Sequence, residues 1–298
     1  MKEIALLGTT ASGKTALSLQ IAKEFDSVIL SLDSLSIYKE IDIASAKPTK
    51  IERGDIIHFG IDEIFPNEHF SSADFLSLYK KAKNFSKNHS KNLIIVGGTS
   101  FYLKSIIEGL SIKPKIDKNI KQKIREIKKS EAYEIILKND PLYASKISKN
   151  DNYRIGKWLE IFFSTGEILS SYFKKNRKIS SAKDIKIFEI TTDRELLKKR
   201  IEKRTLKMIE DGLIDEVFYL EKRYTREPKP LKAIGIKETF EYLDGKISIE
   251  ELPKKIVTST MQLAKRQKTF NKSQFENVTR GDVKTLLKEI KSYILHPK

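Results

Sequence analysis

The sequence predicts an α/β fold in which helices flank a parallel sheet and a mostly helical insertion interrupts the chain. Strands and helices alternate over the first hundred residues, a Gly-, Ser- and Thr-rich octet joins the first strand to the first helix, and residues 115–181 contain no convincing strand. Such alternation forms parallel sheets through right-handed crossovers. We therefore expect a discontinuous core domain at 1–113 and 182–298, with an insertion domain at 114–181.

Short apolar runs predict the strands, and apolar residues at helical spacing predict the helices. The strands are expected at Glu3–Leu7, Ser27–Leu32, Asn92–Val96 and Ile185–Ile190. The helices are expected at Ala16–Phe25, Phe101–Leu110, Lys118–Lys129, Tyr153–Thr165, Arg194–Asp211, Lys237–Leu243, Ile249–Phe270 and Val283–Ile294. Gly166 and Gly212 directly follow two of these helices, where glycine commonly ends a helix.

The composition is that of a protein with a substantial core. Hydrophobic residues make up 39% of the 298 residues, which excludes a disordered chain. The absence of cysteine excludes disulfides, Cys-ligated zinc and a thiol nucleophile. No apolar run approaches the length of about 18 residues that a membrane span needs, so we expect a cytoplasmic protein without membrane association.

The net charge of +17 lies in one part of the chain. Residues 1–112 contain 13 basic and 13 acidic side chains, whereas residues 113–298 contain 44 and 27. Lysine accounts for 46 of the 57 basic residues, so compositional drift is one explanation, but drift should act on both parts. A neutral segment joined to a strongly basic one favours a small-molecule site beside a polyanion-binding surface, with nucleic acid as the first candidate.

Residues 8–15, Gly-Thr-Thr-Ala-Ser-Gly-Lys-Thr, match the P-loop pattern between a strand and a helix. The glycines allow backbone N–H groups to point at one anion, and the positive end of the helix dipole strengthens that attraction. Lys14 supplies a charge for the terminal phosphate, and the Thr15 hydroxyl is placed to bind Mg²⁺. The motif predicts a P-loop NTPase-like site for a di- or triphosphate, without indicating the reaction.

Asp33 directly follows the second predicted strand, at the sheet edge where open α/β sheets bind ligands. A carboxylate there could take a proton from an acceptor group near the phosphates, or it could simply cap the next turn. The third strand ends in Gly97-Gly98-Thr99 and lacks the acidic residue that motor and switch NTPases use for Mg²⁺. A small-molecule kinase that uses ATP stays open on these residues alone.

Several further blocks, in order along nearly the whole chain, resemble the tRNA dimethylallyltransferases, also called tRNA isopentenyltransferases. Besides the P-loop they are Asp33–Lys39, Asp42–Pro48, Phe70–Phe75, Val96–Thr99 with Tyr102, Asn150-Asp151 with Arg154, Arg194–Arg204, Ala233–Gly235 with Lys237-Glu238, and Gln262–Gln267. Colinear blocks are far more specific than a P-loop alone. The resemblance implies transfer of a dimethylallyl group from its diphosphate to the exocyclic amine of the adenosine immediately 3′ of the tRNA anticodon, with release of diphosphate.

The resemblance also assigns roles to individual residues. Catalysis falls to Asp33, Thr10, Lys14 and Arg204. Asp33 would deprotonate the adenine amine, and Arg204 would stabilise the charge on the leaving diphosphate. Arg200 lies one turn before Arg204 on the same helix face. The diphosphate, with a Mg²⁺ cofactor on Thr15, is expected on Gly8, Thr10, Ala11, Ser12, Gly13, Lys14, Thr15 and Arg204.

An anticodon loop suits this reaction because its unpaired bases can leave the stack and be read along their edges. Lys121 and Lys157 stand where the family usually has arginine, and lysine offers a point charge in place of a bidentate contact. The residues expected to approach the tRNA are Asp33, Ser34, Leu35, Ser36, Thr99, Lys121, Tyr153, Arg154, Lys157, Lys232 and Lys237.

Two rival functions accompany this prediction. A small-molecule kinase would use ATP on the same cradle, with Asp33 activating a hydroxyl group. A non-catalytic RNA-binding P-loop protein would bind RNA without modifying it. The expected partners are dimethylallyl diphosphate and the anticodon stem-loop of tRNA, and we expect a monomer that requires no protein partner.

Overall fold

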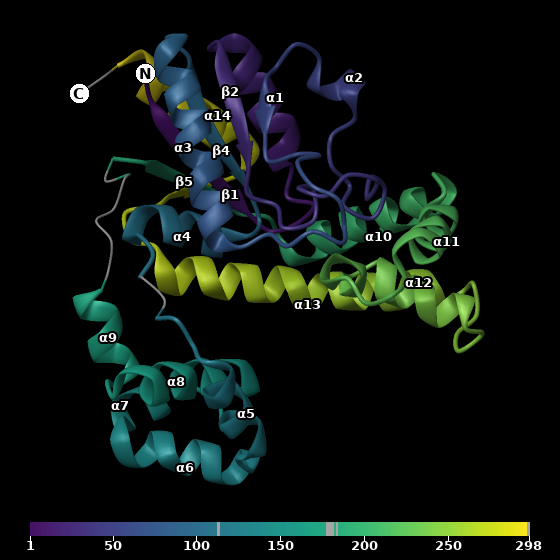
Figure 1. Cartoon of the computed structure of the whole chain (residues 1–298). Helices are drawn as coiled ribbons and strands as arrows, with labels where there is room; N and C mark the ends of the chain where they lie inside the picture. The colour runs from purple at the N-terminus through teal and green to yellow at the C-terminus, as the bar shows by residue number, and fades with distance from the viewer. Residues whose placement is uncertain (112–113, 177–181, 183, 297–298) are drawn as a thin grey trace. The chain divides into compact units, whose positions relative to one another are not determined.

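The computed structural model describes residues 1–111, 114–176, 182 and 184–296. The chain divides into two compact units, which are described separately. The core unit comprises residues 1–107 and 182–298, and the insertion unit comprises residues 108–181 (Figure 1). The insertion unit therefore begins six residues before the domain boundary expected at residue 114.

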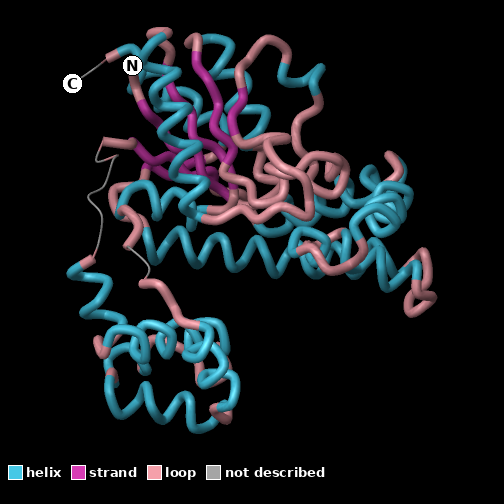
Figure 2. The backbone as a smooth tube through the Cα atoms, in the orientation of Figure 1, coloured by secondary structure: helices cyan, strands magenta, loops and turns pink. Residues whose placement is uncertain are grey.

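One parallel sheet of six strands organises the described residues of the core unit, in the order β3-β2-β4-β1-β5-β6 (Figure 2). The strands are β1 (Glu3–Gly8), β2 (Ser27–Ser31), β3 (His58–Phe59), β4 (Asn92–Gly97), β5 (Lys186–Ile190) and β6 (Thr279–Gly281). Every neighbouring pair is parallel, with Leu6 of β1 opposite Val96 of β4 and Phe188 of β5. The predicted P-loop NTPase-like α/β fold is confirmed, and all four predicted strands lie in this sheet.

Helices cover both faces of the sheet. On one face, α1 (Lys14–Glu24) and α14 (Val283–Leu295) bury Ile21 and Ile290 against strand residues such as Leu6 and Phe188. On the other face, α3 (Ser72–Asn88) buries Tyr79 within the larger apolar cluster of this unit. The remaining helical segments of the core unit are α2 (Lys50–Arg53), α4 (Ser100–Glu108), α10 (Arg194–Glu210), α11 (Leu213–Tyr224), the 3₁₀ turn η1 (Lys229–Lys232), α12 (Ile236–Leu243) and α13 (Glu251–Gln274).

The long helix α13 crosses below the lower ends of the strands in Figure 1, with α10 beside it. Ala264 of α13 packs with Leu197 and Ile201 of α10 in a small apolar cluster. Among the helices that the structure describes, none combines the length and apolar character that crossing a bilayer requires.

The described residues of the insertion unit form helices and no strand. The helices are α5 (Lys118–Glu126), α6 (Lys129–Asn139), α7 (Pro141–Ala144), α8 (Asn152–Thr165) and α9 (Leu169–Lys175). Their core contains the fully buried Trp158, whose Nε1 donates to Asp140 Oδ2 at 3.1 Å. Gly166 ends α8 with a φ of +72°, as predicted. The helix predicted at 118–129 instead breaks at Ile127, whose extended backbone separates α5 from α6.

Candidate active site

The P-loop forms the turn between β1 and α1. Gly8 has a φ of +152° and Gly13 a φ of +99°, backbone conformations that favour glycine. A Cβ atom on Gly8 would lie 2.9 Å from Ser12 Oγ and 3.1 Å from the carbonyl oxygen of Ile190. This tight turn leads into the first turn of α1, where backbone N–H groups without a partner inside the helix can receive an anion.

Two cations and one carboxylate interact beside this loop. Burial lowers the pKa of Lys14 to about 8, because the attraction of Asp33 offsets only part of the desolvation and Arg204 adds repulsion. Burial also lowers the pKa of Arg204, and Asp33 opposes that shift. The Lys14 ammonium donates to the carbonyl oxygen of Thr9. With two cations against one carboxylate, these three groups carry a net positive charge, which favours the binding of a diphosphate anion.

Helix α10 supplies one wall of the site and anchors the loop. Asp193 caps the helix by accepting the N–H groups of Glu195 and Leu196. One face of α10 then presents Arg204 to the site, while Arg200 Nη1 donates to the carbonyl oxygen of Ser12 at 3.3 Å. Arg200 therefore contacts the back of the P-loop, and Arg204 lines the cavity.

Asp33 lies just past the end of β2 and caps the following turn. Its Oδ1 accepts the N–H groups of Leu35 at 2.8 Å and Ser36 at 3.2 Å. No described residue hydrogen-bonds to Oδ2. The capping role and the proposed role as a base are therefore compatible, because one oxygen orients the carboxylate and the other is available for a ligand.

A single cavity of about 520 Å³ joins the P-loop, Asp33 and Arg204. That volume suits a small-molecule ligand. Apolar side chains make up much of its wall, namely Leu35, Ala44, Ile201, Met208, Ile234, Ile256, Leu263 and Phe270. The cavity therefore combines a charged end, which can hold phosphates, with an apolar region, which can hold a hydrocarbon group.

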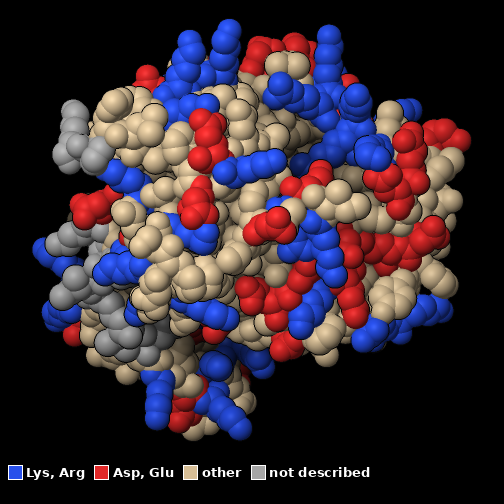
Figure 3. Space-filling view, turned by 90° about the horizontal axis from the view of Figure 1, so that it is seen from above, with Lys and Arg blue, Asp and Glu red and all other residues tan. Residues whose placement is uncertain are grey.

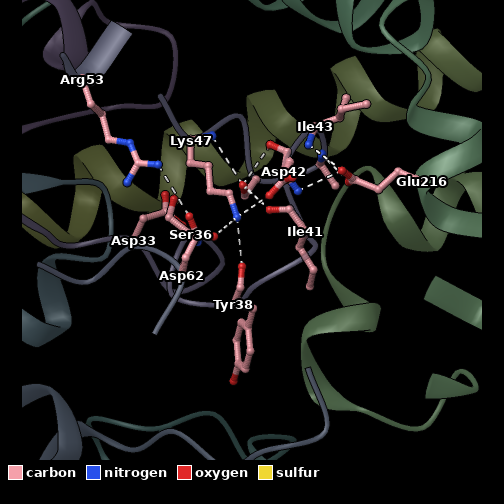
Figure 4. A network of polar contacts seen from close by, with 12 residues as sticks. Asp33, Ser36, Tyr38, Ile41, Asp42, Ile43, Lys47, Arg53, Asp62 and Glu216 are labelled. Atoms are coloured by element: carbon pink, nitrogen blue, oxygen red, sulfur yellow. Dashed lines mark hydrogen bonds and ion pairs between the residues drawn. The ribbon is translucent and has the colours of Figure 1, made fainter. Parts of the chain in front are cut away.

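The segment Ile41–Lys47 places Ala44 and Ser45 on the cavity wall and is held by two charged side chains (Figure 4). Glu216 of α11 accepts the backbone N–H groups of Asp42, Ile43 and Ala44 at 2.8, 2.7 and 2.9 Å. Burial raises the pKa of this carboxylate, and the three N–H donors oppose the shift. The wall is thus fixed by a carboxylate that does not itself line the cavity.

Lys47 anchors the other end of this segment. Its side chain is 6% exposed, pairs with Asp42 at 2.5 Å and with Asp62, and donates to the carbonyl oxygen of Tyr38 at 3.1 Å. Arg53 Nη2 lies 3.7 Å from the second oxygen of Asp62. Because the two carboxylates compensate its charge, the buried Lys47 can link Tyr38, Asp42 and Asp62 within the segments that follow Asp33.

The structure distributes the residues expected to approach tRNA over both units. In the core unit, Asp33, Ser34, Leu35 and Thr99 line the cavity, and Thr99 Oγ1 accepts the N–H of Ser34 at 3.3 Å. Ser36 is only 4% exposed and does not line the cavity, because the turn capped by Asp33 places its side chain inside. Lys232 and Lys237 are exposed on either side of the cavity-lining segment Ala233–Gly235.

The insertion unit presents the other four of these residues on its surface. Lys121 is exposed on α5, and Tyr153 is 73% exposed on α8. Arg154 pairs with Asp151 at 3.2 Å, and Lys157 pairs with Glu160 at 2.5 Å. The pairs lie on the surface, where such interactions are weak enough for RNA phosphates to compete.

Sequence reasoning assigned no role to α13, although this helix forms a whole side of the cavity. Thr260, Leu263, Gln267 and Phe270 line it at intervals of three and four residues, together with Arg266. The helix itself was predicted, and this spacing identifies one face of it. What the sequence alone does not indicate is that this face covers the phosphate cradle, because α13 lies more than 230 residues from the P-loop in the chain.

Known proteins resemble this chain along its length. A sequence model of a family described as IPP transferase matches residues 36–274. The chain is 57% identical over 294 residues to the tRNA dimethylallyltransferase of Aliarcobacter butzleri, covering 98% of this chain and 99% of the relative. It is 52% identical over 293 residues to the tRNA dimethylallyltransferase of Sulfurovum sp., with 97% of each chain covered.

Solved structures agree with these relatives. The tRNA isopentenylpyrophosphate transferase of Bacillus halodurans superposes with a TM-score of 0.74 at 30% identity, covering 99% of this chain and 95% of that one. A eukaryotic dimethylallyltransferase described as acting on tRNA superposes with a TM-score of 0.85 at 25% identity, covering 99% of this chain and 79% of that one. The chain therefore belongs to the IPP transferase family.

Proposed function

We propose that this enzyme transfers a dimethylallyl group from dimethylallyl diphosphate to the exocyclic amine of the adenosine immediately 3′ of the anticodon in tRNAs. The observation that supports this proposal most directly is the cavity that joins Thr10 and Arg204 to Asp33 between apolar walls. Lys14 does not line this cavity, but it lies close enough to interact electrostatically with Asp33 and Arg204. The reaction needs cationic groups for the diphosphate, an apolar wall for the allylic chain and a carboxylate for the nucleophilic amine, all next to one another.

The donor diphosphate would bind the P-loop. Backbone N–H groups at the start of α1 and the charges of Lys14 and Arg204 would stabilise the negative charge that grows as the C–O bond breaks. The pKa of Lys14, lowered to about 8, rises when an anion binds, so the bound lysine is fully charged at neutral pH.

Asp33 would hold and deprotonate the acceptor. As the adenine nitrogen forms its bond to the allylic carbon, the C–O bond electrons leave with the diphosphate and an amine proton passes to the carboxylate. Oδ1 is already fixed by the N–H groups of Leu35 and Ser36, which leaves Oδ2 for the amine. A positioned base of this kind contributes about 10²–10⁴-fold to a rate.

The apolar walls would hold the dimethylallyl group and exclude water. Ile201, Met208, Ile234 and Leu263 line the same cavity as Arg204. A reactive allylic diphosphate hydrolyses in water, so a dry wall protects the donor until the amine arrives.

The residues around the P-loop fit a Mg²⁺ ion that is bound mainly through the donor. Among the described residues no group of three or more His, Cys, Asp or Glu side chains forms a metal site. Mg²⁺ bound to phosphates keeps several waters and needs few protein ligands, and Thr15, exposed in the first turn of α1, would supply a hydroxyl oxygen. When bound, the ion neutralises part of the leaving charge, so we expect a chelator to abolish transfer and added Mg²⁺ to restore it.

We further propose that the monomer is active in the cytoplasm. The P-loop residues Thr10 and Ala11, Asp33 and Arg204 already surround one cavity within a single chain, which supports a catalytic monomer. A uniform mass of one chain in light scattering, at concentrations where the enzyme is active, is the expected result.

A small-molecule kinase would use the same phosphate cradle, and the two functions are distinguished by whether the enzyme uses ATP or dimethylallyl diphosphate. Purified enzyme is incubated with tRNA and either dimethylallyl diphosphate or ATP, and the nucleosides are analysed by mass spectrometry. We expect an adenosine heavier by one dimethylallyl group with the prenyl donor only. Turnover of ATP with small acceptors, and no product with the prenyl donor, would overturn the proposal.

A further inference from the structure

The carboxamide of Gln267 connects two loops of the active site. Its Oε1 accepts the backbone N–H of Thr10 in the P-loop at 3.0 Å. Its Nε2 donates to the carbonyl oxygen of Gly98, in the loop after β4, at 3.2 Å. Gln267 belongs to α13, so a single side chain from a distant helix bonds to both loops at the carboxyl ends of β1 and β4.

The loop that contains Gly98 is in turn hydrogen-bonded to the segment that contains Asp33. Thr99 follows Gly98 directly, and its Oγ1 accepts the N–H of Ser34, the neighbour of Asp33. The Thr99 N–H in turn donates to the carbonyl oxygen of Leu32 at 2.9 Å. Gln267 therefore bonds to the phosphate cradle directly and to the Asp33 segment through one intervening loop.

The space around this carboxamide is filled. A Cβ atom on Gly98 would lie 2.3 Å from Gln267 Nε2 and 3.2 Å from its Cδ. The backbone of Gly98 is free of the left-handed conformations that demand glycine, so close contact with Gln267 is the feature that a side chain there would disturb. Since the contacted atoms are the far end of a flexible side chain, alanine at this position displaces the carboxamide at little cost to the fold.

The Thr10 N–H has its hydrogen-bond acceptor in this side chain. Inside the loop, the Thr9 carbonyl accepts both the N–H of Ser12 at 3.3 Å and the Lys14 ammonium. These bonds, made within the protein, fix the first half of the P-loop. A loop that is ordered before binding loses less entropy when the diphosphate arrives.

We propose that Gln267 is a positioning residue that holds the P-loop in its diphosphate-binding shape and fixes its distance from the Asp33 segment. The inference rests on the proposed function only for its effect on transfer, because its effect on anion binding concerns the ligand-free cradle. A structural alternative is that Gln267 merely docks α13 onto the sheet.

Asn271 separates these two explanations. It lies one turn after Gln267 on the same helix face, and its Nδ2 donates to Glu189 Oε1 of β5 at 2.8 Å. Arg280 Nε holds the other oxygen of Glu189, also at 2.8 Å. Asn271 thus docks α13 onto the sheet without contacting the P-loop, which makes it the matched control.

The test compares Gln267→Met, Gly98→Ala, the double variant and Asn271→Ala. Methionine keeps the length of the side chain and loses both hydrogen bonds, whereas Gly98→Ala displaces the carboxamide from the other side. Binding of inorganic pyrophosphate to each full-length variant is measured by calorimetry, together with the KM values for donor and tRNA. We expect pyrophosphate affinity to fall about tenfold in both single variants, as the loss of two ordinary hydrogen bonds implies.

Three further results are expected if the carboxamide acts by positioning. The double variant should bind pyrophosphate no more weakly than either single variant, because both act through one group. The donor KM should rise while the tRNA KM stays constant, and Asn271→Ala should lower the melting temperature without this selective loss. Unchanged pyrophosphate affinity in Gln267→Met and Gly98→Ala, or an equal loss in Asn271→Ala, would overturn the inference. Failure of the proposed function is seen separately, as a wild-type enzyme that forms no prenylated nucleoside.

Discussion

Asp33 combines two hydrogen-bonding tasks in one carboxylate. Oδ1 caps the turn at Leu35 and Ser36, which fixes the plane of the group, while no described residue hydrogen-bonds to Oδ2, the oxygen proposed to accept the amine proton. The sequence placed Asp33 at the sheet edge but could not decide between cap and base, because a cap and a base differ only in which atoms surround the second oxygen. Asp33 lines the cavity together with Arg204, which supports the proposed role as a base.

The substitution Asp33→Asn separates the two tasks. Asparagine keeps an oxygen that can accept the N–H groups of the turn, but it cannot take a proton from the amine. We expect transfer to slow about 10²–10⁴-fold while pyrophosphate and tRNA affinity are retained. Single-turnover transfer and calorimetry measure these quantities, and a variant with full activity would exclude Asp33 as the base.

Lys14 predicts a pH dependence of diphosphate binding. Its pKa in the ligand-free enzyme is lowered to about 8, and a bound anion favours the charged lysine, so binding takes up a proton when the pH is near or above that value. Affinity for pyrophosphate should therefore fall as the pH rises above about 8. Calorimetry between pH 7 and 9 in two buffers of different ionisation enthalpy measures both the affinity and the proton uptake.

The control for this prediction is Lys14→Arg. Arginine stays charged across that range, so the decline in affinity between pH 7 and 9 should disappear in the variant even if its affinity is lower overall. A decline of equal size in both proteins would assign the titration to another group, such as the ligand itself.

At the scale of elements, the segment Ile41–Lys47 shows how the fold supports the site. Neither Glu216 nor Lys47 lines the cavity, yet between them they hold the backbone that carries Ala44 and Ser45 (Figure 4). A carboxylate that accepts three successive N–H groups takes the place of regular secondary structure there.

Removing the Glu216 carboxylate should destabilise the core unit. In Glu216→Ala the N–H groups of Asp42, Ile43 and Ala44 lose their acceptor, at a cost of about 2–4 kcal/mol. Glu216→Gln keeps one acceptor oxygen and should lose roughly half as much. Urea unfolding of the two variants measures the difference, and equal stability of Glu216→Ala and wild type would contradict the role assigned to this side chain.

The four longer strands were predictable from their apolar runs, and the two short strands were not. The strands β1, β2, β4 and β5 were all expected, since each has five or six consecutive residues with a buried apolar centre. The strands β3 and β6 contain two and three residues, too few to form a pattern. Helix α3 was missed although Ser71 and Asp74 form a capping box before its apolar face, a signal that the sequence does contain.

The site was predictable where local chemistry defines it. The P-loop and the carboxylate after β2 follow from short motifs, whereas Gln267 and Glu216 act through contacts between segments far apart in the chain. Such contacts depend on how α11 and α13 pack against the sheet, which no local pattern encodes. Ser36 shows that a local motif can also mislead. The resemblance predicted that it approaches the tRNA, but the turn after Asp33 buries it.

At the scale of the whole molecule, the structure refines the charge division read from the sequence. The insertion unit, residues 108–181, contains 17 basic and 9 acidic residues, and residues 182–298 of the core unit contain 27 and 19. Both excesses are +8, but the insertion unit is the shorter segment and therefore has the higher charge density. The face in Figure 3 carries basic and acidic side chains intermixed, so the excess charge does not form a uniform surface there.

Binding of tRNA should therefore depend strongly on salt and on the insertion unit. Phosphate contacts release counterions, so we expect the logarithm of tRNA affinity to fall linearly with the logarithm of salt concentration. Lys121→Ala should reduce the slope of that line by about one, because one phosphate contact is lost, and should leave pyrophosphate binding unchanged. Filter binding at several salt concentrations measures the slope, and a flat response would remove electrostatics from tRNA recognition.

The proposed enzyme transfers the dimethylallyl group to the adenosine 3′ of the anticodon, with the donor on the P-loop and Asp33 as the base. The most direct test is mass spectrometry of tRNA nucleosides from cells that carry the wild-type protein, the Asp33→Asn variant or no copy of it. We expect a dimethylallyl adenosine at that position with the wild-type protein and its near absence in the other two. The same nucleoside content in all three cell lines would contradict it.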